Sequence, residues 1–323
     1  MLTRRTFLAA AGAAVIPRPG LAIAAGPLTF WGPPAAPSIV LAHAVASGAL
    51  KEIDASAAFK IWRTPDEMRA GLSSGTMEAV IVPTNVAANL HNRGLDVRLL
   101  NIMTRGLLYV VAGEKIMGIE DLRGKTIAVP FRSDMPDFVL QRLLARAGLN
   151  PQKDVKFDYG GTPPEAMQML LAGRVDAALL AEPAATAAIL RAKLGLTHLA
   201  RAIDCQKEWS RTIGGSGFIP QAGLAVTRGF VDRIGQHGLK TLQDALQATV
   251  NFVVNNPLRA SLASVAQFGV MSPVVAEAVP YSNLIALPAS SVRSDLESFF
   301  SLLAEDDPRI IGGKLPSDAF YAL

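Results

Sequence analysis

The sequence predicts an α/β fold with two lobes, each built on a doubly wound, mostly parallel β-sheet, and two chain crossings that form a hinge. Apolar segments of strand length alternate with helical segments over residues 118–190, which is typical of parallel βαβ units. One pattern of helix start and helix end occurs twice, 98 residues apart, which indicates two similar lobes. A chain of 323 residues is long enough to bury a core in each lobe.

The stretch 118–190 contains three strand-helix units. After the first strand, apolar residues recur at i, i+3, i+4 and i+7 from Leu140 to Ala147, and Gly148 ends that helix. The third helix begins at Pro183. The three strands are predicted at 126–130, 155–158 and 175–180.

The repeated pattern consists of threonine, proline and a glutamate two residues after the proline, at Thr64 to Glu67 and again at Thr162 to Glu165. Threonine is a good N-cap, proline suits the first helical position, and the glutamate can complete a capping box. Eleven residues after each threonine, Gly75 or Gly173 ends the helix, and an apolar strand follows. Chance recurrence is the alternative, because such signals are common.

The first lobe begins with a strand at Leu28 to Trp31 and a proline-rich loop at 32–38. Ser38 is a plausible N-cap for a helix from Ile39 to about Leu50, and a second strand follows at 58–62. Pro83, Thr84 and Asn85 form a strand-to-helix turn that corresponds to Glu182 and Pro183 in the second lobe.

Two segments are predicted to cross between the lobes. An apolar strand at 107–112 leaves the first lobe, and the glycine-rich stretch 214–220 returns to it ahead of a strand at 224–227. The remaining chain has a helical pattern and should complete the first lobe. Its helices are expected at 230–237, 239–254, 257–268 and 290–303.

The N-terminus has the pattern of an export signal. Arg4 and Arg5 precede Phe7 and Leu8, an apolar segment follows, and the small-x-small sequence at 22–24 predicts cleavage near Ala24-Ala25. The paired arginines favour the twin-arginine form of such signals, and a Sec signal is the alternative. The apolar segment is too short to span a bilayer, so we predict that residues 1–25 are removed on export.

Charge and cysteine content exclude several classes of protein. The formal charge of +4 includes Arg4, Arg5 and Arg18 of the leader, which leaves 28 basic and 27 acidic residues in the rest of the chain. A nucleic-acid-binding face is therefore not expected. Cys205 is the single cysteine, which excludes an internal disulfide and a thiolate metal cluster. No apolar run of 18 residues follows the leader, so we expect a soluble protein without stable membrane insertion.

Three sequence stretches together resemble a known family. GIEDLRGKTIAVP at 118–130, ARAGLNPQKDV at 145–155 and LLAGRVDAALLAEPAA at 170–185 are similar, in this order, to the second lobe of periplasmic substrate-binding proteins. The group concerned serves ABC importers of the nitrate, taurine and sulfonate type, and it resembles the binding proteins for the pyrimidine precursor of thiamine. The resemblance is good over this stretch and loose over the rest of the chain.

This resemblance implies a type 2 periplasmic binding protein fold, with lobe 1 at 26–107 and 218–323 and lobe 2 at 108–217. It also implies a monomeric periplasmic protein that traps a small organic molecule and passes it to an inner-membrane ABC permease. Two alternatives remain: a sensor that presents its ligand to a receptor, and an enzyme on the same fold. Eukaryotic enzymes of that kind, which make the thiamine pyrimidine, carry a cysteine-rich motif, so the single cysteine disfavours the second alternative.

Catalytic and metal-binding motifs are missing from the sequence. His43, His91, His198 and His237 have no second ligand at metal spacing. The chain contains no GxSxG, HExxH, P-loop or GxGxxG motif. We therefore predict no catalytic residue, no metal and no cofactor.

Ligands of open α/β sheets bind outside the carboxyl ends of the strands, so the candidate residues lie in the strand-to-helix loops. In the first lobe, Trp31 could stack on a flat ligand or pack under its own loop. Ser38, Thr84 and Asn85 could hydrogen-bond a ligand, and capping is an alternative role for Thr84.

The second lobe offers Arg132, Ser133 and Asp134 at one helix start. Asp134 and the nearby Asp137 would compete with an anion there, and Arg132 offsets them only in part. Glu182 could hold a ligand N–H, cap its helix or pair with a lysine. These acids and the neutral donors around them predict a neutral or weakly charged organic ligand with a planar or apolar part, in preference to nitrate or a short sulfonate.

Overall fold

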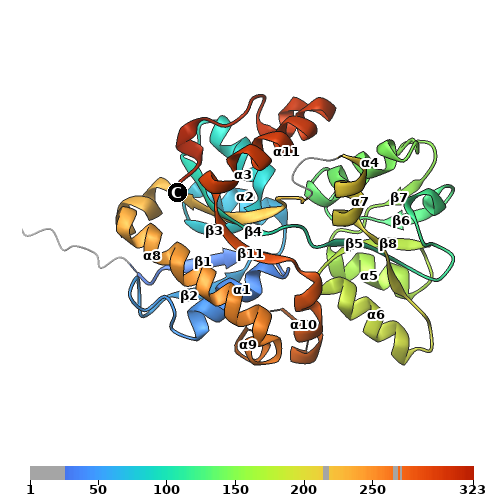
Figure 1. The fold of residues 1–323 in the computed structure, drawn as a ribbon, viewed down its shortest axis with the longest axis horizontal. Helices are drawn as coiled ribbons and strands as arrows, with labels where there is room; N and C mark the ends of the chain where they lie inside the picture. The colour runs from blue at the N-terminus through green and yellow to red at the C-terminus, as the bar shows by residue number, and fades with distance from the viewer. Residues whose placement is uncertain (1–25, 214–217, 265–267, 270) are drawn as a thin grey trace, which may run out of the picture.

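The computed structural model describes residues 26–213, 218–264, 268, 269 and 271–323 (Figure 1). The predicted export signal at 1–25 lies outside the described residues, as do 214–217 of the predicted return crossing. The chain forms two α/β lobes, as the sequence predicts, and each is built on one β-sheet.

A six-stranded sheet in the order β11-β4-β10-β3-β1-β2 forms the first lobe. It brings together the N-terminal strands and two strands that follow the second lobe in the sequence. Its strands in chain order are β1 (Thr29–Gly32), β2 (Ala58–Ile61), β3 (Ala79–Pro83), β4 (Val97–Thr104), β10 (Ala222–Thr227) and β11 (Leu284–Pro288).

A five-stranded sheet in the order β7-β6-β8-β5-β9 forms the second lobe. Its strands are β5 (Leu108–Ala112), β6 (Thr126–Ala128), β7 (Lys156–Asp158), β8 (Ala177–Ala181) and β9 (Ala200–Asp204). The two segments that join the lobes run side by side, since the Ile219 N–H donates to the Arg105 carbonyl at 3.1 Å.

Both sheets are mixed, whereas the sequence predicted mostly parallel strands. β10 is antiparallel to β3 and β4, and β5 is antiparallel to β8 and β9. The reason is the direction of entry. β5 and β10 each enter their lobe at the edge where the parallel strands end, so they run opposite to those strands. The carboxyl ends of β1, β3, β6 and β8 therefore point toward the other lobe.

The helices cover both faces of each sheet (Figure 1). Those of the first lobe are α1 (Pro37–Ala46), α2 (Pro65–Ser74), α3 (Thr84–Asn92), α8 (Arg228–Asn255), α9 (Pro257–Ser264), α10 (Ser272–Ala278) and α11 (Arg293–Asp306). Those of the second lobe are α4 (Met135–Arg146), α5 (Pro163–Leu171), α6 (Ala184–Leu194) and α7 (Cys205–Thr212). Short 3₁₀ turns lie at η1 (Ile119–Leu122), η3 (Val279–Tyr281), η4 (Ala289–Val292), η5 (Pro308–Ile311) and η6 (Asp318–Phe320).

The repeated helix-start pattern is confirmed in both lobes. The Thr64 hydroxyl oxygen accepts the Glu67 N–H at 3.2 Å, and Thr162 accepts the Glu165 N–H at 3.4 Å. The Glu165 carboxylate in turn accepts the Thr162 N–H at 2.8 Å, which completes a capping box. The predicted N-cap at Ser38 is wrong, because α1 begins at Pro37 with Ala36 as its N-cap.

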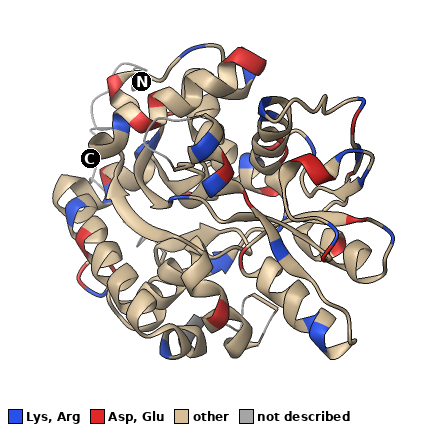
Figure 2. Cartoon of the chain, turned by 45° about the vertical axis from the view of Figure 1, so that its right-hand side comes forward, with Lys and Arg blue, Asp and Glu red and all other residues tan. Residues whose placement is uncertain are grey.

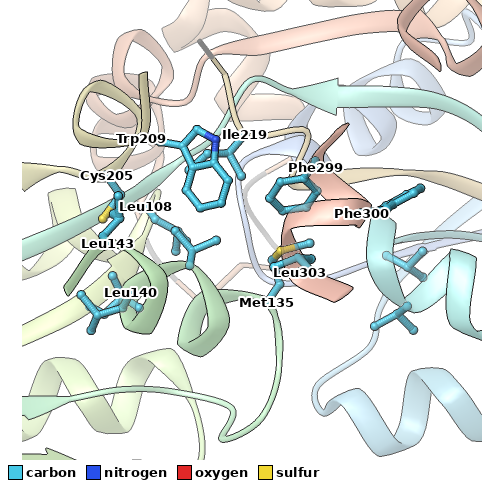
Figure 3. Packing of buried hydrophobic residues seen from close by; sticks show 14 of the residues in the cluster. Leu108, Met135, Leu140, Leu143, Cys205, Trp209, Ile219, Phe299, Phe300 and Leu303 are labelled. Carbon is cyan, nitrogen blue, oxygen red and sulfur yellow. The ribbon is translucent and has the colours of Figure 1, made fainter. Parts of the chain in front are cut away.

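One apolar cluster continues from the first lobe into the second. In Figure 3, Trp209 of α7 and Phe299 of α11 face each other, with Leu303 and Met135 beside them. The Trp209 and Phe299 ring centroids are 5.5 Å apart. The lobes are thus packed together along one side by buried apolar contacts, which favour this arrangement through the area that they remove from water.

Candidate functional site

A cavity of about 80 Å³ lies between the lobes, where the strand-to-helix loops of both sheets meet. Its walls are mainly proline and other apolar residues, eight of the nineteen lining residues being proline. The first lobe contributes Pro33, Pro34, Ala35, Pro37, Trp62, Pro65, Val82, Pro83, Gln221 and Ala222. The second lobe and the crossing into it contribute Leu107, Leu108, Pro130, Phe131, Asp134, Met135, Pro136, Pro163 and Ala181.

Four helices that point their N-termini at this cavity begin with proline in their first or second position. These prolines are Pro37, Pro65, Pro136 and Pro163, and all four line the cavity. Helix N-termini bind anions through free backbone N–H groups, and proline has none. The capping side chains of α2, α4 and α5 occupy further N–H groups. The cavity therefore presents few donors to a buried anion.

An ion pair joins the two lobes at the cavity wall. Asp134 is 3% exposed and caps α4 by accepting the Met135 N–H at 2.8 Å. Its other oxygen accepts a hydrogen bond from Arg69 Nη2 of α2, in the opposite lobe, at 2.9 Å. Burial raises the pKa of the Asp134 carboxyl, and the Arg69 guanidinium opposes that rise. Asp134 is thus committed to a protein partner.

Arg132 and Ser133 are exposed and do not line the cavity. The Arg132 guanidinium lies over the Tyr159 ring, 5.1 Å from its centroid. The Ser133 N–H donates to Asp137 at 2.8 Å, so this donor of the loop is already occupied. Of the three residues predicted at this helix start, the structure brings Asp134 alone to the cavity.

Glu182 is fully buried, and its carboxylate takes the capping and ion-pair roles, with an arginine in place of the expected lysine. It accepts bonds from the Thr186 hydroxyl at 2.7 Å and from Arg201 Nε at 2.7 Å. Arg201 in turn lies 3.5 Å from the ring centroid of Tyr281, which belongs to the first lobe. The Glu182 carbonyl accepts the Ala36 N–H across the lobes at 2.9 Å. Glu182 therefore holds the lobes together behind the cavity.

The four predicted residues of the first lobe lie around the cavity without lining it. The Ser38 hydroxyl donates to the Pro33 carbonyl at 2.6 Å and holds the proline loop. The Thr84 hydroxyl donates to the Pro220 carbonyl at 2.6 Å and holds the return crossing. Asn85 is 3% exposed, and its Oδ1 has no partner among the described residues.

Trp31 lies inside β1, so its indole is directed to a face of the sheet that helices cover, and Lys60 lies 5.4 Å from its ring centroid. Trp62, one residue beyond β2, provides the indole of the cavity instead, and its Nε1 donates to the Ile81 carbonyl at 2.9 Å. Trp62, Gln221 and Arg69 were not among the site residues predicted from the sequence. For Trp62 the available signal was position, because a residue just beyond a strand lies at the sheet edge.

The described residues contain no group of His, Cys, Asp and Glu placed to hold a metal ion. Within the same residues, no helix is both long enough and apolar enough to cross a membrane. In the view of Figure 2, basic and acidic residues are interspersed on both lobes.

Solved structures of low sequence identity share this fold. An ABC transporter protein from Parabacteroides distasonis has a TM-score of 0.76 at 21% identity, covering 91% of this chain and 98% of that one. The periplasmic aliphatic sulphonate binding protein SsuA from Escherichia coli has a TM-score of 0.69 at 15% identity, with coverage of 91% and 98%. The periplasmic nitrate-binding protein NrtA from Synechocystis PCC 6803 has a TM-score of 0.60 at 12% identity, with coverage of 77% and 69%.

No curated protein sequence matches the chain. The family comparison is positive: residues 52–267, well over half of the chain, match the NMT1-like family. The two-lobed fold and this match agree with the resemblance found in the sequence. The chain therefore belongs to the NMT1-like family.

Proposed function

We propose that the protein is the substrate-binding component of an ABC importer. It captures a small organic molecule between its lobes in the periplasm and delivers it to an inner-membrane permease. The observation that carries the proposal is the apolar cavity whose walls come from the strand-to-helix loops of both lobes. The names of the solved structures support it, since they include an ABC transporter protein and periplasmic binding proteins for sulphonate and nitrate.

Residues 1–25 serve as the export signal in this proposal. Residues 26–107 with 218–323 then move as one lobe against residues 108–217, and the protein acts as a monomer. The short distance along the chain between β4, which ends at Thr104, and β5, which begins at Leu108, supports a hinge there. Because the cavity is lined by both lobes, rotation about this hinge opens it to solvent.

The ligand is neutral or weakly charged and largely apolar. A buried anion needs several hydrogen-bond donors, and the prolines and caps at the surrounding helix starts remove or occupy them. Asp134 borders the ligand, while Ser38, Thr84 and Glu182 shape the loops around it. The remaining predicted residues do not line the cavity and affect ligand binding only indirectly: Trp31, Asn85, Arg132 and Ser133. A neutral or weakly charged ligand distinguishes the protein from the similar structures that are named for sulphonate and nitrate.

No chemistry is performed on the ligand in this proposal. Of the described residues that line the cavity, Asp134 alone has a titratable side chain, and Arg69 holds it. A nucleophile with an adjacent base is needed for covalent catalysis. The lining residues offer no such pair.

A thermal-shift screen of the purified protein tests the proposal. The compounds are sulfonates, oxyanions, pyrimidines, flavins and aromatic acids, with small neutral amides and arenes added. A ligand present at about 100 times its Kd should raise stability by about 2.7 kcal/mol, because it binds only the folded state. Saturating ligand should also reduce the radius of gyration in solution scattering. Tight binding of nitrate or taurine would contradict the ligand class, and an unchanged radius at saturation would contradict closure.

A further inference from the structure

The cavity contains one buried side-chain amide that lacks a partner. Gln221 is 7% exposed and lines the cavity, and its Oε1 receives no hydrogen bond from the described residues. The other polar residue among the lining residues, Asp134, is paired with Arg69. Among the residues that line the cavity, Gln221 is therefore the one whose side-chain acceptor has no partner among the described residues.

The backbone holds Gln221 in this place. Its carbonyl accepts the Thr84 N–H at 3.1 Å, and its N–H donates to the Ile219 carbonyl at 2.7 Å. The side chain thus projects from a fixed point directly before β10. Burying an amide without a partner costs free energy, so a ligand that supplies the partner gains from this position.

The second lobe shows that the fold does not require an amide here. Ala222 of β10 pairs with Pro83, and Leu108 of β5 pairs with Ala181, which lies 98 residues after Pro83. The residue before Ala222 is Gln221, and the residue before Leu108 is Leu107. Both line the cavity from equivalent positions. An apolar side chain therefore suits this position, and the amide needs a separate explanation.

We propose that Gln221 recognises a cyclic amide. The inference rests on the proposed function, since it names the ligand class of the same cavity. A glutamine amide presents one acceptor and one donor side by side, and a lactam presents a C=O and an N–H on one edge. The two groups can form a pair of parallel hydrogen bonds. Phe131, Trp62 and the prolines then contact the rest of a flat ring.

The size of the cavity limits the ligand. At about 80 Å³ it is little more than half of the roughly 150 Å³ of an apolar protein cavity that binds benzene. A single six-membered ring is therefore accommodated only with a slight further opening of the lobes, and larger groups are disfavoured. A charged carboxylate is disfavoured because Asp134 lies in the same wall.

Three probes of similar size test the inference by calorimetry. 2-Pyridone has the complete donor-acceptor edge, 1-methyl-2-pyridone lacks the N–H, and toluene has neither group. We expect the protein to bind 2-pyridone at least about tenfold more tightly than the other two. Gln221→Met should abolish this preference, because it keeps the length and removes the amide. Gln247→Met, the same substitution at an exposed position of α8 outside the cavity, should keep it.

Side-chain amide NMR of the unaltered protein gives a readout that needs no variant. 2-Pyridone should shift the Gln221 NH₂ resonances, and toluene should leave them in place. Equal affinity for 2-pyridone and its methyl derivative, or a preference that survives Gln221→Met, overturns the inference. If 2-pyridone does not bind while another compound of the thermal-shift screen does, the cyclic-amide class is wrong and the binding function stands. If no compound of either set binds, both proposals fail.

Discussion

Arg142 provides a test of how the lobes are held together away from the cavity. It lies on α4 of the second lobe with its side chain 10% exposed, and it pairs with Glu305 and Asp306 at the end of α11 in the first lobe. The bond from Nη1 to the Asp306 carboxylate is 2.8 Å long. Arg142→Met keeps most of the buried aliphatic stem and removes the charge. We expect this variant to fold normally and to open more readily.

The magnitude follows from the burial of the two ends. An exposed ion pair contributes about 0.2–1 kcal/mol, and breaking a buried one costs about 3–5 kcal/mol. Arg142 is nearly buried, whereas Glu305 and Asp306 are 61% and 48% exposed. We therefore expect the pairing of Arg142 with these two carboxylates to stabilise the observed arrangement of the lobes by about 1–3 kcal/mol. Loss of this pairing should raise the ratio of open to closed molecules by roughly 5-fold to 150-fold.

Spin labels measure this ratio directly. Lys153 in the second lobe and Gln236 in the first are exposed, so cysteines placed there can be labelled. The native Cys205 is fully buried and should not react. The distance distribution between the labels should acquire a longer component in Arg142→Met. Arg211→Met is the control, because Arg211 pairs with Glu208 inside one helix and should leave the distribution unchanged. Identical distributions in all three proteins would refute a role for Arg142 in closure.

Three further predictions concern export, pH and packing. Arg4→Lys with Arg5→Lys should retain the precursor in the cytoplasm if the signal is of the twin-arginine type, and normal export in cell fractionation would identify a Sec signal. Hydrogen bonding to the Arg142 guanidinium lowers the pKa of Glu305 below its usual 4.5, so the stabilisation is present above pH 4.5 and is lost as the pH falls through the lowered value. The longer distance between the spin labels should therefore appear as the pH falls. The same pH dependence of that distance in Arg142→Met, which lacks the guanidinium, would contradict the role given to the pair of Arg142 and Glu305. Trp62→Ala should lower the free energy of unfolding, measured by urea titration, by about 3–5 kcal/mol, because Trp62 is buried. Trp31→Ala should lower it by less, because Trp31 is partly exposed. A larger loss in Trp31→Ala than in Trp62→Ala would contradict this description of the packing.

Local signals were sufficient for much of the fold. The threonine caps at Thr64 and Thr162, the glycines that end their helices and the alternation of strand and helix predicted the paired lobes. β4, β9, α7 and β11 were missed. β9 and β11 are edge strands, and each is defined by its pairing with one neighbour, which sequence pattern does not reveal.

The sequence by itself also determined which edge of the sheets would form the site, because parallel strands joined by helices leave their carboxyl ends together. It did not determine which side chains reach that edge. Inside β1 and β2, residues alternate between two covered faces, so Trp31 faces a helix layer, while Trp62 lies beyond its strand and reaches the cavity.

Tertiary structure alone decided the partners of the charged groups. Asp134 meets Arg69, 65 residues away in the sequence. Glu182, directly after β8, meets Arg201 of β9, although β5 lies between these two strands in the sheet. Whether a buried carboxylate is available to a ligand depends on such partners, because an unpaired buried charge is too costly to persist. Only the docking of the two lobes placed Asp134 and the unpartnered Gln221 in the lining of one cavity and so defined the chemistry of that cavity.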